Sequence, residues 1–160
     1  MIAYLSLGAN IGNREQTLLQ AVEALNQQVG PVLQRSDFYY SRAWGFDSEH
    51  DFCNLCLAIQ TDLSPYELLF ATQAIERQLG RTHKTTLRQG QPVYSDRTID
   101  IDIIRAFDSN GSEIIINQKS KIKNLKSKIS DGLPSLTLPH PLWQERDFVK
   151  IPLDSILAKN

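Results

Sequence analysis

The hydrophobic positions of this chain follow strand and helix periods in turn. Residues 2–8 are mostly apolar and predict a buried strand. Apolar residues then recur at helical spacing over 18–29, and the Gly-Pro pair at 30–31 predicts the end of that helix. Residues 32–41 contain β-forming aromatic residues and predict a second strand. The N-terminal part therefore predicts the order strand, helix, strand.

The following residues repeat these element types. Residues 52–61 predict a strand, and the Ser-Pro-Tyr-Glu string at 64–67 predicts a helix start, because it combines an N-cap, a first-turn proline and a capping-box glutamate. This helix reaches Gly80, a polar loop covers 81–96, and residues 97–104 predict another strand. The order βαββαβ is that of a ferredoxin-like fold. We therefore expect an α+β fold with a ferredoxin-like core.

The C-terminal pattern adds shorter elements and no domain boundary. A turn is expected at 108–111, a short strand at 113–116, a short helix at 142–147 and a return toward the core at 148–153. A length of 160 residues suits one domain. We therefore expect a single domain over 1–160.

Composition and charge limit the class of function. Hydrophobic residues make up 41% and charged residues 22%, as in ordinary globular chains. The net charge of -1 excludes a uniformly basic nucleic-acid binder and an acidic disordered chain. Five lysines lie within 119–128, and without them the balance is 12 basic against 18 acidic residues, or -6. The chain is therefore mildly acidic with a local basic segment.

This basic segment looks like an insertion over about 117–132, and three interpretations of it stay open. Ile122, Leu125 and Ile129 have helical spacing and would suit a short amphipathic helix. The segment would also suit a disordered loop or a docking patch for an acidic partner. We favour a solvated insertion outside the functional machinery.

Other features bear on location. No apolar run reaches about 18 residues, and the N-terminus lacks the basic and long apolar regions of a signal peptide. Two cysteines, Cys53 and Cys56, cannot form a disulfide framework, which fits a reducing cytoplasm. On a strand they point to opposite faces, so their spacing favours an incidental pair over a zinc or redox site. We expect a cytoplasmic protein without membrane or nucleic-acid partners.

Paired acids give the strongest chemical signal. In Asp100-Ile101-Asp102-Ile103, the two carboxylates share one strand face at roughly 7 Å, while the isoleucines share the other. The acids are either a solvated strand face or ligands for one or two Mg²⁺ ions. Cations crowd the preceding loop, and carboxylates with mobile cations are typical of phosphoryl transfer. The cations are Arg81, His83, Lys84, Arg88 and Arg97.

A second signal lies on the strand at 52–61. Phe52 and Asn54 share one face and offer a stacking ring beside an amide, which suits a flat heterocycle. An ordinary half-buried strand would look the same. The sequence has no Walker A motif, and residues 8–12 are not a dinucleotide fingerprint. A bound nucleotide would have to be held in another way.

Seven stretches in order along the chain carry a resemblance to a known family. They are Tyr4-Leu-Ser-Leu-Gly8-Ala-Asn10-Ile-Gly12, Phe38-Tyr39 with Trp44-Gly45-Phe46, Phe52-Cys-Asn54, Glu76-Arg-Gln-Leu-Gly80-Arg81, Arg97-Thr-Ile-Asp100-Ile-Asp102-Ile103, Pro139-His140-Pro141, and Arg146-Asp-Phe148-Val. Over about residues 2–154, these stretches resemble the 6-hydroxymethyl-7,8-dihydropterin pyrophosphokinase family. The string at 97–103 and the strings from 139 to 149 are highly specific together.

This resemblance implies a three-layer α/β/α domain with a mostly antiparallel sheet, which transfers pyrophosphate from ATP to a pterin hydroxymethyl group and releases AMP. It implies ATP as co-substrate, two Mg²⁺ ions held by Asp100 and Asp102, and a monomer. The implied catalytic residues are Arg81, Arg97, Asp100 and Asp102. The implied pterin contacts are Ser41, Arg42, Ala43, Trp44, Phe52, Asn54 and Phe148. The implied ATP contacts are Gln73, Glu76, His83, Arg97, Ile103, His140 and Arg146.

The chain departs from the family pattern in the loop before the acids. His83 stands where many relatives have arginine, so this cationic contact weakens or passes to Lys84 or Arg88. Shorter relatives have the residues Trp-Gly-Pro-Arg in the stretch before the acids, and Tyr94 is a candidate to replace that tryptophan here. Ser41-Arg42 replaces the frequent Thr-Pro.

Two other functions remain to be weighed against the enzyme. A non-catalytic ferredoxin-like metabolite-binding module would not explain paired acids beside an arginine-rich loop. An RNA-binding domain would stack bases on sheet aromatics, but the sequence has no RNP-type aromatic string.

Overall fold

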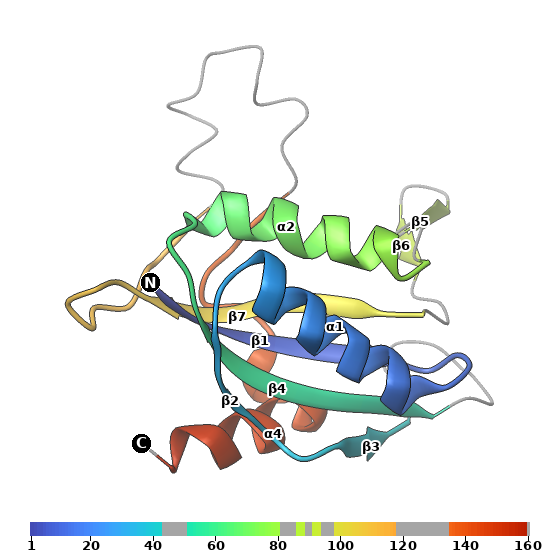
Figure 1. Cartoon of the computed structure of the whole chain (residues 1–160). Coiled ribbons are helices and arrows are strands. Elements are labelled where there is room, and N and C mark those ends of the chain that lie inside the picture. The colour runs from blue at the N-terminus through green and yellow to red at the C-terminus, as the bar shows by residue number, and fades with distance from the viewer. Residues whose placement is uncertain (43–50, 81–85, 89–90, 94–97, 118–134, 160) are drawn as a thin grey trace.

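The protein forms a five-stranded antiparallel main sheet that is covered by helices on both faces (Figure 1). The computed structural model describes residues 1–42, 51–80, 86–88, 91–93, 98–117 and 135–159, with 86–88 and 91–93 described for the backbone alone. No helix in these ranges is long and apolar enough to cross a membrane. The elements are β1 (Ile2–Ala9), α1 (Arg14–Gln28), β2 (Val32–Arg35), β3 (Tyr39–Ser41), β4 (Phe52–Gln60), α2 (Pro65–Gln78), β5 (Thr86–Arg88), β6 (Gln91–Val93), β7 (Asp100–Phe107), the 3₁₀-helix η2 (Trp143–Glu145) and α4 (Asp147–Leu157).

The main sheet has the strand order β2-β4-β1-β7, and β3 also pairs with β4. Its pairs are antiparallel. Helices α1 and α2 cover one face, and α4 covers the other (Figure 1). Each interface has its own apolar core: one includes Leu5, Leu25 and Ile75, and the other includes Ile104 and Leu153. The predicted α+β fold with a ferredoxin-like core and three layers is confirmed.

The predicted strand over 32–41 is divided in two. Between β2 and β3, the backbone N–H of Ser36 donates to the carbonyl of Cys56 at 2.8 Å. The Ser36 hydroxyl accepts from the N–H of Cys56 at 2.9 Å, so a side chain takes the place of a backbone ladder group. The sequence pattern does not reveal this substitution, because the residues on either side keep their β-forming character.

Two further regions differ from the sequence prediction. The loop predicted at 81–96 contains the short antiparallel hairpin β5–β6. The strand predicted at 113–116 is reduced to isolated bridges, Phe107 with Glu113 and Ile116 with Leu138. The turn at 108–111 is confirmed, with the N–H of Gly111 donating to the carbonyl of Asp108 at 3.0 Å.

The helix α4 completes the third layer. The predicted short helix at 142–147 is reduced to the 3₁₀-helix η2, and the residues after it form α4 rather than a simple return to the core. Pro152 lies inside α4, and because a proline usually argues against a helix, the sequence did not predict one here. The buried positions Val149, Leu153 and Ile156 nevertheless have helical spacing.

The two cysteines are buried on opposite faces of β4, as the strand period predicts. Cys53 belongs to the core under α1 and α2, and Cys56 to the core under α4, where its thiol donates to the carbonyl of Val149 at 3.5 Å. Desolvation raises the pKa of Cys53 to about 11 and that of Cys56 to about 12.

Neither thiol is therefore expected to react in the folded protein at pH 8, because the thiolate is the reactive form and both pKa values lie above that pH. An aromatic disulfide reagent should release its chromophore only as the chain unfolds in urea. Rapid release by one thiol in the native protein would show that its burial is incomplete.

Candidate active site

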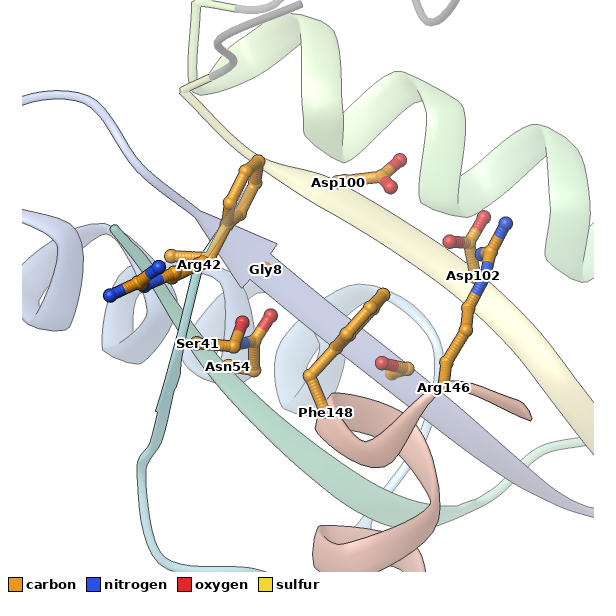
Figure 2. A pocket seen from close by; sticks show the side chains of 10 residues that line it. Gly8, Ser41, Arg42, Asn54, Asp100, Asp102, Arg146 and Phe148 are labelled. Carbon is orange, nitrogen blue, oxygen red and sulfur yellow. The ribbon is translucent and has the colours of Figure 1, made fainter. Parts of the chain in front are cut away.

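A cleft opens on the α4 side of the sheet, where β1, β4 and β7 meet the end of β3 and the start of α4 (Figure 2). It encloses about 500 Å³, counting space that is open to solvent. Both groups of residues predicted from the sequence, the acid pair on one strand and the Phe52–Asn54 pair on another, contribute to it. The lining residues are Ser6, Gly8, Ser41, Arg42, Phe52, Asn54, Asp100, Asp102, Arg146 and Phe148.

The strand register places three functional positions in one row across the sheet. Gly8 of β1 pairs with Asn54 of β4 on one side and with Asp100 of β7 on the other. Paired residues of neighbouring strands project to the same face. Asn54 and Asp100 therefore stand two strand spacings apart, roughly 10 Å. The glycine between them leaves this part of the cleft floor free of side chain.

Asp100 and Asp102 form the acidic end of the cleft. Both are half-buried, while the alternate residues Ile101 and Ile103 are buried in the opposite core. The prediction that the two acids share one face is confirmed. Figure 2 shows both carboxylates at the β7 side of the cleft.

This pair fits a magnesium site by its donor type. Within the described part of the chain, no group of three or more His, Cys, Asp and Glu side chains is arranged to hold a metal ion. Mg²⁺ commonly takes one or two protein carboxylates and completes its octahedron with substrate phosphates and water. Two accessible carboxylates in a cleft suit that pattern, and Asp100 and Asp102 are the residues that would hold the ion.

The amide of Asn54 forms the other end and is held in one orientation. Asn54 is 2% exposed. Its Nδ2 donates to the carbonyl of Tyr39 at 3.0 Å and to the hydroxyl of Ser41 at 2.9 Å. Both amide hydrogens are thereby used, and Figure 2 shows the amide oxygen on the side of Gly8. Asn54 therefore presents an acceptor to a ligand in the cleft.

Gly8 makes this orientation possible. A Cβ at position 8 would lie 3.0 Å from Oδ1 of Asn54 and 3.6 Å from a ring carbon of Phe52. Such a contact would displace the amide or fill the cleft floor. A glycine inside a strand is a known signal for close approach of another group, but Gly8 was not among the predicted site residues.

The start of α4 provides the remaining wall. Phe148 lies in its first turn and Arg146 precedes it, with the guanidinium carbon 5.9 Å from the centre of the Phe148 ring. In Figure 2, the ring of Phe148 stands over the cleft, and Arg146 extends on the Asp102 side. Arg42 lines the cleft too, but its guanidinium points away from the acids (Figure 2).

Four residues assigned to ATP contacts do not line the cleft, and three of them belong to β7 or bond to it. Ile103 belongs to β7 and is 4% exposed, and the buried Glu76 accepts a hydrogen bond from the N–H of Ile101 at 3.1 Å. The N–H of His140 donates to the carbonyl of Ile104 at 2.8 Å. Gln73 is half-buried on α2, the helix that packs against β7 on the side away from the cleft. The structure therefore groups Glu76, Ile103 and His140 around one strand.

His140 has a defined tautomer in its neutral form. Its Nδ1 accepts a hydrogen bond from the N–H of Leu142 at 3.2 Å. The ring hydrogen of the neutral imidazole is therefore on Nε2.

Several predicted site residues cannot be placed. Ala43, Trp44, Arg81, His83, Lys84, Tyr94 and Arg97 lie outside the described residues, as does most of the insertion predicted at 117–132. Of Arg88, only the backbone in β5 is described.

Residues 4–158 match the family described as 7,8-dihydro-6-hydroxymethylpterin-pyrophosphokinase (HPPK). The chain belongs to this family. The 2-amino-4-hydroxy-6-hydroxymethyldihydropteridine pyrophosphokinase of Porphyromonas gingivalis is 41% identical over 155 residues, which are 97% of this chain and 90% of that one. The protein of the same name from Bacillus subtilis is 35% identical over 156 residues, covering 97% of this chain and 77% of the relative.

Solved structures of HPPK-DHPS proteins share the fold. One, described as a complex with substrates, matches with a TM-score of 0.62 at 16% identity, covering 98% of this chain and 40% of that chain. A triple mutant from Plasmodium falciparum gives a TM-score of 0.61 at 16% identity, covering 96% and 40%. This chain thus corresponds to about two fifths of the length of those proteins. The resemblance drawn from the motifs is confirmed, and the roles of individual HPPK residues stay predictions.

Proposed function

We propose that this chain transfers the pyrophosphoryl group of ATP to the hydroxymethyl group of 6-hydroxymethyl-7,8-dihydropterin and releases AMP, a step of folate biosynthesis. One observation supports this above the others. The row Asn54–Gly8–Asp100 places an amide that can read a heterocycle edge and an acid that can hold Mg²⁺ on either side of a bare floor. The chain belongs to the HPPK family, whose description is that of a pyrophosphokinase, and this supports the same reaction.

The pterin would occupy the amide end. Its flat ring fits between the side chains of Phe52 and Phe148, which line the cleft together. The Oδ1 of Asn54 would accept from an N–H group on the edge of the ring, because its Nδ2 is already held by Tyr39 and Ser41. This position fixes the hydroxymethyl oxygen relative to the acidic end.

The triphosphate would occupy the acidic end. Magnesium bound by Asp100 and Asp102, in the two-ion arrangement that the resemblance implies, would neutralise phosphate charge there. Arg146 lines this part of the cleft, and Arg81, Arg97 and His83 are expected to add further cations. The guanidinium groups bind the non-bridging oxygens and favour the charge that develops during transfer.

The chemistry needs no protein nucleophile. The hydroxymethyl oxygen attacks the β-phosphorus of ATP, forming one O–P bond, while the bond from that phosphorus to the α,β-bridging oxygen breaks. The bridging oxygen leaves as part of AMP, and the hydroxyl proton passes to solvent. The loop over 81–97 is expected to exclude competing water, because hydrolysis of ATP would waste the donor.

Ser41→Ala is expected to raise the KM for the pterin about three- to tenfold, since the loss of one neutral hydrogen bond corresponds to roughly 0.5–1.5 kcal/mol. The KM for ATP should stay unchanged. Ser41→Thr keeps the hydroxyl and serves as the matched control. Steady-state kinetics with each substrate varied would check this, and an equal rise in both KM values would contradict a role in orienting Asn54.

The proposal is tested by AMP formation. Purified protein with Mg-ATP should form AMP only when 6-hydroxymethyl-7,8-dihydropterin is added, as measured by chromatography of the nucleotides. The absence of pterin-dependent AMP would reject the proposed function. The cytoplasmic location, the monomeric state and the number of magnesium ions stay predictions.

A further inference from the structure

Glu76 is buried beside the strand that carries the two acids. It is 3% exposed, and it is the only carboxylate among the buried residues of the described chain. Its Oε2 accepts a hydrogen bond of 3.1 Å from the backbone N–H of Ile101. Burying a carboxylate is unfavourable unless such bonds compensate it, and an apolar residue would pack at lower cost. The position of Glu76 therefore needs a reason besides packing.

The hydrogen bond acts on the outer edge of β7. This strand ends the described sheet order and has β1 as its neighbour. The N–H groups of successive residues point to opposite sides of a strand. Since the N–H of Ile101 points to Glu76, those of Asp100 and Asp102 point toward β1. Glu76 thus holds, from outside the sheet, the one residue that separates the two acids.

Helix α2 is a firm support for this contact. Its first turn is closed by a capping box, in which the side chains of Ser64 and Glu67 bond each other's backbone N–H groups. Its inner face is fixed by the fully buried Leu68 and Ile75. The side chain that reaches β7 therefore starts from a backbone that is held at both its N-terminus and its core face.

We propose that Glu76 is a positioning residue for the metal-binding acids: its bond to Ile101 fixes the start of β7 and thereby the placement of Asp100 and Asp102 in the cleft. Ligands of a metal ion depend on supporting hydrogen bonds for their orientation. The inference rests on the proposed function, because it takes the two acids as magnesium ligands. It gives Glu76 a role through the strand backbone in addition to the ATP contact that the resemblance implies.

Three variants test this role. Glu76→Ala removes the acceptor, whereas Glu76→Gln keeps a carbonyl oxygen that can accept from Ile101. Ile75→Val is the matched control, because it trims a fully buried side chain of the same helix turn without touching the bond. All measurements are made well below the melting temperature of each variant, so that unfolded protein does not contribute to the measured values.

Two readouts other than activity are used. The first is amide hydrogen exchange of Ile101, which should speed up at least tenfold in Glu76→Ala relative to Ile75→Val. The second is calorimetric affinity for Mn²⁺ in the presence of a non-hydrolysable ATP analogue, which should fall about three- to tenfold in Glu76→Ala. Glu76→Gln should recover most of both values.

The outcomes separate this inference from the proposed function. Unchanged Mn²⁺ affinity in Glu76→Ala, or Glu76→Gln as impaired as Glu76→Ala, would overturn the positioning role. A loss of metal-free nucleotide binding with unchanged exchange at Ile101 would also overturn it, because Glu76 would then act by direct contact alone. A wild-type protein that binds no Mn²⁺ with the analogue would instead reject the proposed function.

Discussion

Asp100→Ala and Asp102→Ala are each expected to lower kcat by at least about a hundredfold, in the range seen when a charge-stabilising group is removed from an active site. Each acid lines the cleft on the same strand face and would hold Mg²⁺, which would neutralise phosphate charge there. Turnover measured as AMP formation at saturating substrates would check the loss. Asp154→Asn on α4 is a matched control, because it removes one exposed carboxylate that does not line the cleft.

The fold should survive both substitutions. The two carboxylates repel each other along the same strand face, and the strand is held by the buried Ile101 and Ile103 on its other side. Melting temperatures close to that of the wild type are therefore expected. Near-normal turnover in either alanine variant would contradict the metal assignment, and a large fall in melting temperature would show that the acid has a structural role.

Phe148→Ala is expected to weaken pterin binding by roughly 5- to 150-fold, since loss of stacking between an aromatic side chain and a base costs about 1–3 kcal/mol. Phe52→Ala should have an effect in the same direction, because both rings line the cleft. Binding of ATP should change little. Calorimetry with each ligand, the pterin being titrated in the presence of a non-hydrolysable ATP analogue, would measure the two affinities separately.

Phe70→Ala provides the control for this series. Phe70 is an exposed aromatic residue on α2, with 47% of its surface accessible, and it does not line the cleft. Its removal should leave both affinities at wild-type values. If Phe148→Ala weakened ATP binding as much as pterin binding, the assignment of the aromatic end to the heterocycle would be wrong.

The sequence predicted those parts of the site that depend on strand period. The alternation in Asp100-Ile101-Asp102-Ile103 is a local property of one extended strand, and the structure confirms the face on which the acids lie. The same period placed Phe52 and Asn54 together. Such predictions succeed because the side-chain direction in a strand depends only on position along it.

The parts that were missed depend on contacts between distant segments. The division of β2 from β3 arises from the hydroxyl of Ser36 on the backbone of Cys56, which no local pattern shows. The role of Gly8 follows from the register of three strands and its distance to Asn54. The contact of Glu76 requires knowledge that α2 packs against the outer edge of β7.

The C-terminal helix is a different case. Its apolar period was present in the sequence, but Pro152 interrupts the residues that carry it. A proline in a helix removes one backbone hydrogen bond and usually argues against a helix. Here the burial of Val149, Leu153 and Ile156 against the sheet outweighs that cost. Tertiary packing, rather than the local sequence, therefore makes the segment that carries Phe148 helical.

The β- and γ-phosphates of ATP are expected to move to the acceptor as one unit. The ³¹P spectrum of the products, recorded after reaction with Mg-ATP and 6-hydroxymethyl-7,8-dihydropterin, distinguishes this transfer from its alternatives. AMP and a pterin diphosphate ester should form in equal amounts. ADP with a pterin monophosphate ester would rule out transfer as one unit, and AMP accompanied by free pyrophosphate would show hydrolysis in its place.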